Sequence, residues 1–381
     1  MTPNPTENTT ASLFPGRQSK LATALYNAKL DALALNPSPS LKYLTGLEFH
    51  LMERPVVALF KPHSPPVIVL PELEGGKTRQ LDYPVQIFPY GEDPHTWQAA
   101  FRQAAHASGL ESGRIGLEPG RMRVLELRFL EEAAPDAQFV SAEQSIAELR
   151  MSKDPTELEA MRKAAQIAQR ALQATLPKIE AGMTERQVAA ELTQQLLRAG
   201  SEPELPFFPI VSGGPNSANP HATPSNRKLQ SGDLLVIDYG ASYQGYISDI
   251  TRTFAVGQVQ DELAHIHKIV QQANQAGHKA VQPGITAEQV DAAARTVIEQ
   301  AGYGEYFIHR TGHGLGMEGH EPPYIRAGNT LKLAAGMTFT IEPGIYLPGK
   351  GGVRIEDDVV VSEDGLESLT DLPRELIRVG A

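Results

Sequence analysis

Two carboxylates in the second half of the chain occupy positions where β-strands would bring them together. The apolar run 234–237 predicts a strand that ends at Asp238. Residues 246–254 alternate, include β-branched and aromatic side chains, and predict a second strand that carries Asp249. Two carboxylates that close repel each other unless a proton or a cation lies between them. The alternative is that Asp238 starts a turn and Asp249 faces water.

Histidines gather in a glycine-rich segment farther along the chain. His309, His313 and His320 lie within twelve positions of a chain that has 11 histidines, and glycines flank His313 on both sides. Glycine lets the backbone approach a ligand closely and leaves room for the imidazole. Because a lone histidine is more often structural, it is the grouping that indicates a site.

Two glutamates complete the candidate set. Residues 338–341 predict a strand that ends at Glu342. Residues 351–358 predict a single strand in which Arg354, Glu356 and Asp358 share a face, because side chains alternate with a period of two. A carboxylate within a strand is costly to bury unless it is paired or binds a cation. The alternative for Glu356 is a salt bridge with a neighbouring arginine.

Asp238, Asp249, His313, Glu342 and Glu356 together form an oxygen-rich set of donors with one imidazole. Such a set suits divalent ions such as Mn²⁺, Co²⁺ or Zn²⁺ better than copper. Two ions about 3.5–4 Å apart can share a hydroxide, because metal binding lowers the pKa of water from about 15.7 towards neutrality. The ions would also polarise a substrate carbonyl, and nearby imidazoles would stabilise the oxyanion. The set therefore predicts a hydrolytic metal centre.

The chain is long enough to hold these residues in one of two domains. Its 381 residues exceed the size at which a single hydrophobic core usually stops growing. We interpret residues 1–16, rich in Thr, Asn and Pro, as a flexible tail, and residues 17–150, with helical patterns and short apolar runs, as an α/β domain. Asp154 and Pro155 are a helix-start signal just after this domain. Residues 151–381 then form the second domain, which carries all five candidate ligands.

The second domain contains an internal repeat at a constant offset. Each copy has a glycine turn, a threonine that can cap, and an amphipathic helix that ends at glycine. The alternative is that capping chemistry has few solutions, but the constant register favours duplication and a pseudo-two-fold α+β domain with a cleft between its halves. The first copy contains Gly182, Thr184, Gln187, Val188, Ala190, Ala199 and Gly200, which recur as Gly284, Thr286, Gln289, Val290, Ala292, Ala301 and Gly302.

The composition excludes several classes of protein. The formal net charge of −11 argues against a nucleic-acid groove or an anionic membrane surface as partner, since either attracts an excess of Lys and Arg. The absence of cysteine excludes disulfides, thiolate zinc sites, iron–sulfur clusters and cysteine nucleophiles. No stretch reaches the roughly 18–20 apolar residues needed to span a bilayer, and the N-terminus lacks the apolar run of a signal peptide. We therefore expect a cytoplasmic protein.

In type and order, the five candidate ligands resemble those of the pita-bread metallopeptidases, the family of methionine aminopeptidases, Xaa-Pro aminopeptidases and Xaa-Pro dipeptidases (prolidases). The resemblance covers nearly all of residues 150–375. It implies an α+β pita-bread domain preceded by an α/β creatinase-type N-terminal domain, and two divalent ions per subunit, Mn²⁺ first and Co²⁺ or Zn²⁺ as alternatives. In this resemblance Asp238 is bidentate to one ion, Asp249 and Glu356 bridge the pair, and His313 and Glu342 complete one ion.

Two further histidines resemble those of the proline-specific branch. His221 and His320 match residues that lie near the scissile bond in those enzymes. With Glu342 as the proton shuttle, they are the expected catalytic residues. The resemblance thus implies metal-dependent hydrolysis of Xaa-Pro bonds, in which a hydroxide held by the two ions attacks the carbonyl without demanding the N–H that proline lacks.

The length of the substrate depends on a cation near the pocket. A dipeptidase must recognise the carboxylate of a C-terminal proline, and Arg310 is the expected partner, with Arg326 as a second candidate. The alternative is that Arg310 is an ordinary solvent-facing charge. By resemblance, His309, Tyr346 and Arg354 are the other expected substrate-binding residues. We expect an Xaa-Pro dipeptidase, with an Xaa-Pro aminopeptidase acting on longer peptides as the alternative.

A third hypothesis is a pita-bread protein that serves only in binding. Such proteins normally lose metal ligands, and none is lost in this sequence. The expected partners are short proline-containing peptides, and resemblance to family members with the same N-terminal domain implies a homodimer.

Overall fold

The computed structural model describes residues 13–380, and the chain divides after Arg150 into two compact units. Helix α1 (Leu13–Ala28) includes residues 13–16 of the predicted tail, whereas residues 1–12 lie outside the described range. Among the described residues, no helix is long and apolar enough to cross a membrane.

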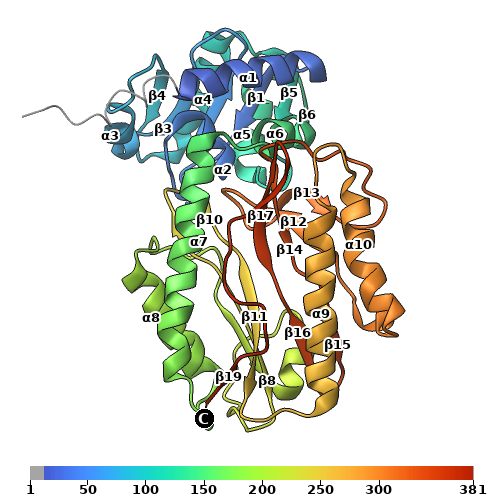
Figure 1. Cartoon of the computed structure of the whole chain (residues 1–381). Coiled ribbons are helices and arrows are strands. Elements are labelled where there is room, and N and C mark those ends of the chain that lie inside the picture. The colour runs from blue at the N-terminus through green and yellow to red at the C-terminus, as the bar shows by residue number, and fades with distance from the viewer. Residues whose placement is uncertain (1–12, 381) are drawn as a thin grey trace, which may run out of the picture. The chain divides into compact units, whose positions relative to one another are not determined.

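The N-terminal unit is a mixed sheet with helices packed on it (Figure 1). Its strands follow the order β4-β3-β2-β1-β5-β6. Strand β2 pairs antiparallel with both β1 and β3, and the other neighbours are parallel. Trp97 and Phe101 of α4 are buried in one core with Val57 and Val69 of the sheet. After α1 the elements are β1 (Ala32–Leu35), α2 (Pro39–Thr45), β2 (Val57–Phe60), β3 (Val67–Pro71), η1 (Glu72–Glu74), α3 (Gly75–Thr78), β4 (Gln86–Tyr90), α4 (Pro94–Ser108), β5 (Ser112–Leu117), α5 (Val124–Ala133), β6 (Asp136–Ser141) and α6 (Glu143–Met151).

The C-terminal unit begins at the predicted helix start. Asp154 caps α7 (Pro155–Thr175), and Glu157 closes a capping box. The first half of the unit continues with η2 (Leu176–Lys178), α8 (Glu185–Ala199), β7 (Ile210–Gly213), η3 (Gly214–Ala218), β8 (Leu234–Tyr239), β9 (Ser242–Tyr243), β10 (Tyr246–Ile247) and β11 (Ile250–Val256).

The second half repeats the plan of two helices followed by strands. Thr184 caps α8 and Thr286 caps α10, each in a capping box with the glutamine three residues later. The elements are α9 (Asp261–Ala280), α10 (Ala287–Gln300), η4 (Gly304–Tyr306), β12 (Gly312–Gly314), β13 (Glu321–Ile325), β14 (Thr338–Ile341), β15 (Gly344–Leu347), β16 (Gly351–Arg354), β17 (Asp357–Ser362), β18 (Gly365–Ser368) and β19 (Arg378–Val379).

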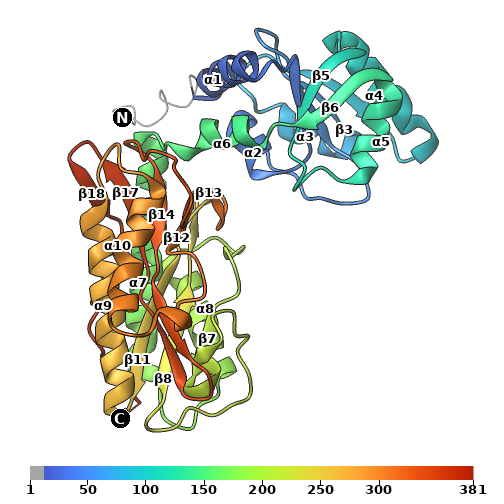
Figure 2. The same cartoon turned by 90° about the vertical axis from the view of Figure 1, so that its right-hand side faces the viewer.

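Each helix pair of the C-terminal unit covers its own strands. The views in Figures 1 and 2 place α7 and α8 beside one part of the β-structure and α9 and α10 beside the other. Apolar residues of α7 and α8 share a core with β7, β8 and β11, which belong to a sheet of order β19-β11-β8-β7. Residues of α10 share a core with β14 and β17, which belong to a sheet of order β13-β12-β14-β17-β18.

The single strand predicted for residues 351–358 is interrupted. Strand β16 ends at Arg354 and pairs with β15, whereas β17 begins at Asp357 and pairs with β14 and β18. The prediction of one strand was wrong, because the two pieces satisfy their backbone hydrogen bonds in different sheets. Glu356 lies at this break, between the end of β16 and the start of β17.

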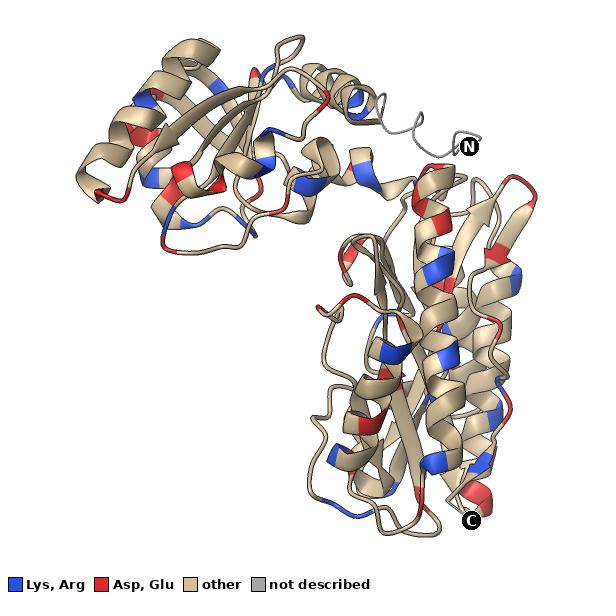
Figure 3. Ribbon diagram, turned by 90° about the vertical axis from the view of Figure 1, so that its left-hand side faces the viewer, with Lys and Arg blue, Asp and Glu red and all other residues tan. Residues whose placement is uncertain are grey.

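Charged side chains are spread over the surface. Figure 3 shows Lys and Arg interspersed with Asp and Glu along the helices of both units.

Candidate metal centre

Asp238 lies on β8, and Asp249 directly precedes the antiparallel neighbour β11, because the strand predicted for residues 246–254 is interrupted between β10 and β11. Asp238 on β8 lies opposite Thr251 on β11, and Asp249 comes two residues before Thr251. Because side chains alternate along a strand, Asp249 and Thr251 lie on the same face, and that face is shared with Asp238. The small hairpin of β9 and β10 connects the two strands.

His313 lies on β12, and Glu342 directly follows β14, which is the neighbour of β12 in the same sheet. The backbone N–H of His313 donates to the hydroxyl of Thr340 at 3.2 Å, and the N–H of Glu342 donates to the carbonyl of Thr311 at 2.7 Å. The two segments approach so closely at Gly312 that a Cβ there would lie 1.8 Å from the carbonyl oxygen of Thr340. Glycine is therefore needed immediately before His313.

Glu356 is held by Thr251 of β11. Its backbone N–H donates to the carbonyl of Thr251 at 3.1 Å, and its Oε2 accepts from the hydroxyl of Thr251 at 2.5 Å. Nε of Arg354 donates to the same hydroxyl at 3.1 Å. Thr251 thus fixes both the backbone and the side chain of Glu356.

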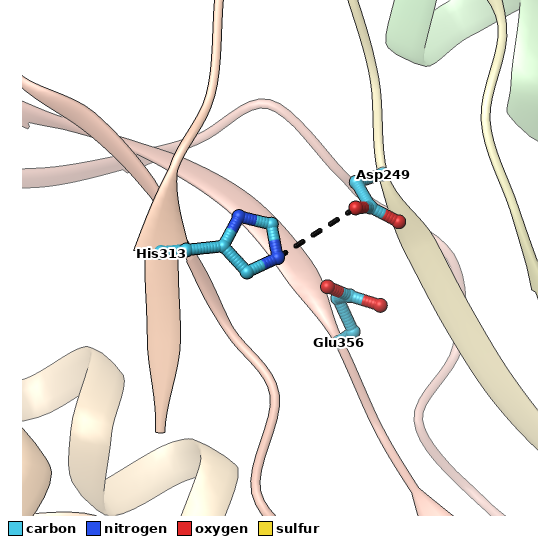
Figure 4. Close-up of side chains that lie close together, drawn as sticks. All are labelled: Asp249, His313 and Glu356. Carbon is cyan, nitrogen blue, oxygen red and sulfur yellow. Dashed lines mark ion pairs between the residues drawn. The ribbon is translucent and has the colours of Figure 1, made fainter. Parts of the chain in front are cut away.

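Four of the five predicted ligands converge at one point, namely Asp249, His313, Glu342 and Glu356. One ligand atom each from Asp249, His313 and Glu356 lie within 4.8 Å of one another (Figure 4). Nε2 of His313 lies 3.3 Å from Oε1 of Glu342 and 3.8 Å from Oδ2 of Asp249. Nδ1 of His313 lies 3.2 Å from the carbonyl of Gly314. Because a carbonyl can only accept, Nδ1 carries the proton and Nε2 presents its lone pair to the carboxylates.

Asp238 has one oxygen engaged and one free. Oδ2 accepts from Nη2 of Arg354 at 2.6 Å, whereas Oδ1 is buried without a hydrogen-bond partner among the described residues. Nη1 of Arg354 donates to the hydroxyl of Tyr346 at 2.9 Å. A buried carboxylate oxygen without a donor is costly in the absence of a cation.

The carboxyl groups perturb one another strongly. Burial raises the pKa of Asp249 well above its usual range, and the charges of Glu356 and Asp238 raise it further. Burial, followed by the charges of Glu342 and Asp238, does the same to the pKa of Glu356. The pKa of Glu342 rises to about 8, chiefly through burial. Burial lowers the pKa of His313 to about 3, so its imidazole is neutral at pH 7.

The donor set fits divalent cations. It combines crowded carboxylates, the unpartnered Oδ1 of Asp238 and a neutral imidazole whose lone pair faces those carboxylates. A divalent cation replaces the mutual repulsion of the carboxylates by attraction and so lowers their pKa values.

Two other predicted histidines lie at different distances from this cluster. The ring of His320 packs against that of His313, with centroids 4.0 Å apart. His221 is exposed. Burial lowers the pKa of His320, and the charges of Arg310 and His221 lower it further. The residue before it, Pro220, accepts a hydrogen bond from Nη1 of Arg354 at 3.3 Å.

The remaining predicted pocket residues differ in their contacts. His309 lies 2.9 Å from the hydroxyl of Tyr346 through Nε2 and 3.9 Å from Oε2 of Glu342 through Nδ1. The guanidinium of Arg310 stacks over the ring of Tyr324 at 4.6 Å. Arg326 is exposed and donates to the carbonyl of Ala327 at 2.9 Å. This contact is with its neighbour in the chain and not with a residue of the metal centre.

Sequence reasoning missed the residues that support the ligands. Besides Thr251 and Thr340, Asp358 accepts from the backbone N–H of Asp249 with both oxygens, at 3.0 and 3.2 Å. The period of two between Asp249 and Thr251 was a signal that could have found the threonine. No sequence signal pairs Asp358 with Asp249, because that contact joins two sheets.

Fold and site together define a metal-dependent hydrolase whose ligands come from two related halves. The chain belongs to metallopeptidase family M24, which matches residues 159–363, while residues 17–152 match the Creatinase/Prolidase N-terminal domain. The predicted family and α+β fold class are thereby confirmed. Membership makes the chain a peptide-hydrolysing enzyme that depends on divalent metal ions.

Relatives span both proline-specific activities that the sequence suggests. The probable dipeptidase PepE of Mycobacterium tuberculosis is 39% identical over 97% of each chain. The crystal structure of the prolidase from Thermococcus sibiricus matches 96% of this chain and 99% of its own with a TM-score of 0.90 and 35% identity. The X-Pro aminopeptidase from Thermotoga maritima matches 95% of this chain and 99% of its own with a TM-score of 0.83 and 32% identity.

Proposed function

We propose that this protein is an Xaa-Pro dipeptidase that uses two divalent ions held by Asp238, Asp249, His313, Glu342 and Glu356. The observation that carries the proposal is the convergence of Asp249, His313 and Glu356 within 4.8 Å, with Glu342 3.3 Å from Nε2 of His313. The similarity to a prolidase and to a probable dipeptidase supports the substrate class.

We propose Mn²⁺ as the native ion, because four carboxylates and one imidazole offer mostly hard oxygen donors; Co²⁺ and Zn²⁺ are the alternatives. When bound, the ions supply a nucleophile at neutral pH by lowering the pKa of water and polarise the scissile carbonyl. The remaining tasks fall to side chains of the chain itself.

Glu342 is the proposed proton shuttle. Its pKa of about 8 shows how readily this buried carboxyl group takes up a proton when no cation is near. Oε2 would accept a proton from the attacking water and deliver it to the proline nitrogen, which as a tertiary amide must gain a proton to leave. His221 and His320 would donate hydrogen bonds to the oxyanion.

Arg310 is proposed to bind the carboxylate of the C-terminal proline. Its stacking on Tyr324 at 4.6 Å leaves the edge of the guanidinium available for a planar, bidentate partner. Truncation of this contact should affect dipeptides more than longer peptides, since in a longer peptide the proline carboxylate is an amide.

The competing function is an Xaa-Pro aminopeptidase, which the similarity to the Thermotoga maritima enzyme favours. The test compares kcat/KM for Xaa-Pro and Xaa-Pro-Xaa substrates with Mn²⁺ and with Co²⁺. Faster cleavage of the dipeptide is expected, and faster cleavage of the tripeptide would establish the aminopeptidase instead. Metal analysis is a separate control, because a folded protein that takes up no divalent ion would leave only a binding role.

We further propose a homodimer in the cytoplasm, acting on short proline-containing peptides. The N-terminal unit, similar to the Creatinase/Prolidase N-terminal domain, supports the first part. Light scattering on the purified full chain measures the mass, and a monomer at working concentration would contradict the proposed dimer.

A further inference from the structure

An ion pair outside the metal centre holds the segment that carries His309 and Arg310. Asp291 on α10 is 1% exposed, and its Oδ1 accepts from the backbone N–H of Thr311 at 3.1 Å and from its hydroxyl at 2.7 Å. Arg295, one turn later on α10, donates to both oxygens of Asp291 from Nε and Nη2, each at 3.0 Å.

Arg295 also reaches the other end of this segment. Nη1 donates to the carbonyl of Phe307 at 3.1 Å, and Nη2 donates to the carbonyl of His309 at 2.8 Å. The guanidinium stacks over the ring of Phe307 at 4.1 Å. One ion pair thus fixes the backbone of residues 307–311 at three places.

From this segment, hydrogen bonds lead directly into the centre. The carbonyl of Thr311 accepts from the N–H of Glu342 at 2.7 Å. Nδ1 of His309 lies 2.7 Å from the carbonyl of Arg310, so Nδ1 carries the proton and Nε2 accepts from the hydroxyl of Tyr346 at 2.9 Å. Both ring nitrogens of His309 are therefore engaged within the protein.

The corresponding helix of the first half has no such pair. At the constant offset of the repeat, the residues of α8 that correspond to Asp291 and Arg295 are Ala189 and Thr193. Thr193 only donates to the carbonyl of Ala189 at 2.9 Å, within its own helix. The ion pair is therefore present on α10, which contacts the His309 segment, and has no counterpart on α8.

We infer that Asp291 and Arg295 are a positioning pair that places Glu342 and Arg310 for the reaction. The inference rests on the proposed function. Neither side chain touches the reacting atoms, and both act through the backbone of residues 307–311. The pair acts by fixing the conformation of this segment, because its hydrogen bonds reach three backbone groups of residues 307–311. A displacement of about 1 Å in a reacting group can cost about 100-fold in rate.

The test uses the full chain loaded with Mn²⁺ and the variants Arg295→Lys and Asp291→Asn. Lysine cannot bridge Asp291 and two carbonyls at once, and asparagine offers only one acceptor oxygen. We expect kcat on an Xaa-Pro dipeptide to fall about 10- to 100-fold, with calorimetric affinity for Mn²⁺ also weakened, because Glu342 is a proposed ligand. Arg170→Lys is the matched control, since Arg170 donates to the carbonyl of Ala199 at 3.0 Å at the end of α8; its kcat should equal that of the wild type.

A second measurement does not depend on activity. The amide of Thr311 donates both to Asp291 and to the carbonyl of Ile325, at 3.1 and 3.0 Å. In metal-free Asp291→Ala, where only the carbonyl remains, hydrogen exchange at this amide should accelerate, while exchange in α8 stays unchanged. Because the side chain of Arg295 is 24% exposed, added guanidinium should also restore part of the kcat of Arg295→Ala.

Two results would overturn the inference: wild-type kcat in Arg295→Lys, or unchanged exchange at Thr311. A wild-type enzyme that is inactive on Xaa-Pro dipeptides would instead contradict the proposed function, and the exchange measurement would still decide the inference.

Discussion

Arg354 and Asp238 form a buried ion pair at the edge of the metal centre. Nη2 of Arg354 lies 2.6 Å from Oδ2 of Asp238, and the two side chains are only 4% and 12% exposed. The bond fixes the carboxylate so that its buried Oδ1 is the oxygen left for a cation. The same guanidinium donates to Tyr346 and to Thr251, which in turn holds Glu356.

Replacing this arginine by lysine should impair the enzyme. In Arg354→Lys a single ammonium group replaces the planar guanidinium, which donates to Asp238, Tyr346 and Thr251 at once. Asp238 can then rotate away from its ligand position. We expect kcat/KM to fall about 10- to 100-fold, with weaker calorimetric affinity for Mn²⁺. Arg162→Lys is the control, because Arg162 makes a comparable two-point ion pair with Glu367 outside the centre. Wild-type kinetics in Arg354→Lys would refute the assignment of Asp238 as a ligand held by Arg354.

The close contact at Gly312 makes a second prediction. In Gly312→Ala the new Cβ would lie 1.8 Å from the carbonyl oxygen of Thr340, so the strand that carries His313 must move. We expect the free energy of unfolding to fall by about 1–3 kcal/mol and Mn²⁺ affinity to weaken. Gly76→Ala is the control, since its Cβ would meet no atom within 4 Å. Urea titration and calorimetry measure both quantities, and equal behaviour of the two variants would contradict the predicted strain.

The crowded carboxyl groups predict how stability depends on pH when metal is removed. The pKa of Glu342 is raised from 4.5 to about 8, mainly by burial. The folded protein therefore retains a proton that the unfolded chain has released, so the contribution of Glu342 to the free energy of unfolding is complete below pH 4.5 and is lost as the pH rises towards 8. Urea titrations in EDTA between pH 5 and pH 8.5 should show this decline, and Mn²⁺ should remove most of it. A flat profile in EDTA would show that the carboxyl groups are not crowded.

A buried histidine away from the ligands predicts the opposite slope. Burial, followed by the charge of Arg252, lowers the pKa of His267 from 6.5 to about 4. Its contribution to stability is complete above pH 6.5 and is lost as the pH falls towards 4, by about 3 kcal/mol. We compare the free energy of unfolding of the wild type with that of His267→Gln, and the difference should decrease as the pH falls from 6.5 to 4. The control is His265→Gln, which changes an exposed histidine on the same helix. A difference that is constant with pH would contradict the prediction.

Local sequence already contained the elements of the site. The capping signals at Asp154, Thr184 and Thr286 predicted where helices begin, because a cap is a contact among residues three apart. The apolar runs before Asp238 and Glu342 predicted strands that end in carboxylates, and these strands are β8 and β14. The interruption after Arg354 was not predictable, because residues 351–358 alternate throughout and only the partner strands assign the two pieces to different sheets.

The sequence by itself determined the type and order of the five candidate ligands, the repeat that pairs the two halves, and the family to which the chain belongs. These depend on residue identity and on spacing along the chain. Only the tertiary structure decided the state of each ligand atom: Nε2 of His313 presents its lone pair, Oδ1 of Asp238 has no hydrogen-bond partner among the described residues, and Oε2 of Glu356 accepts from Thr251. It also placed Asp291 and Arg295 under the His309 segment. Such contacts join residues far apart in the chain, and their geometry is fixed by packing between sheets and helices, which no local pattern encodes.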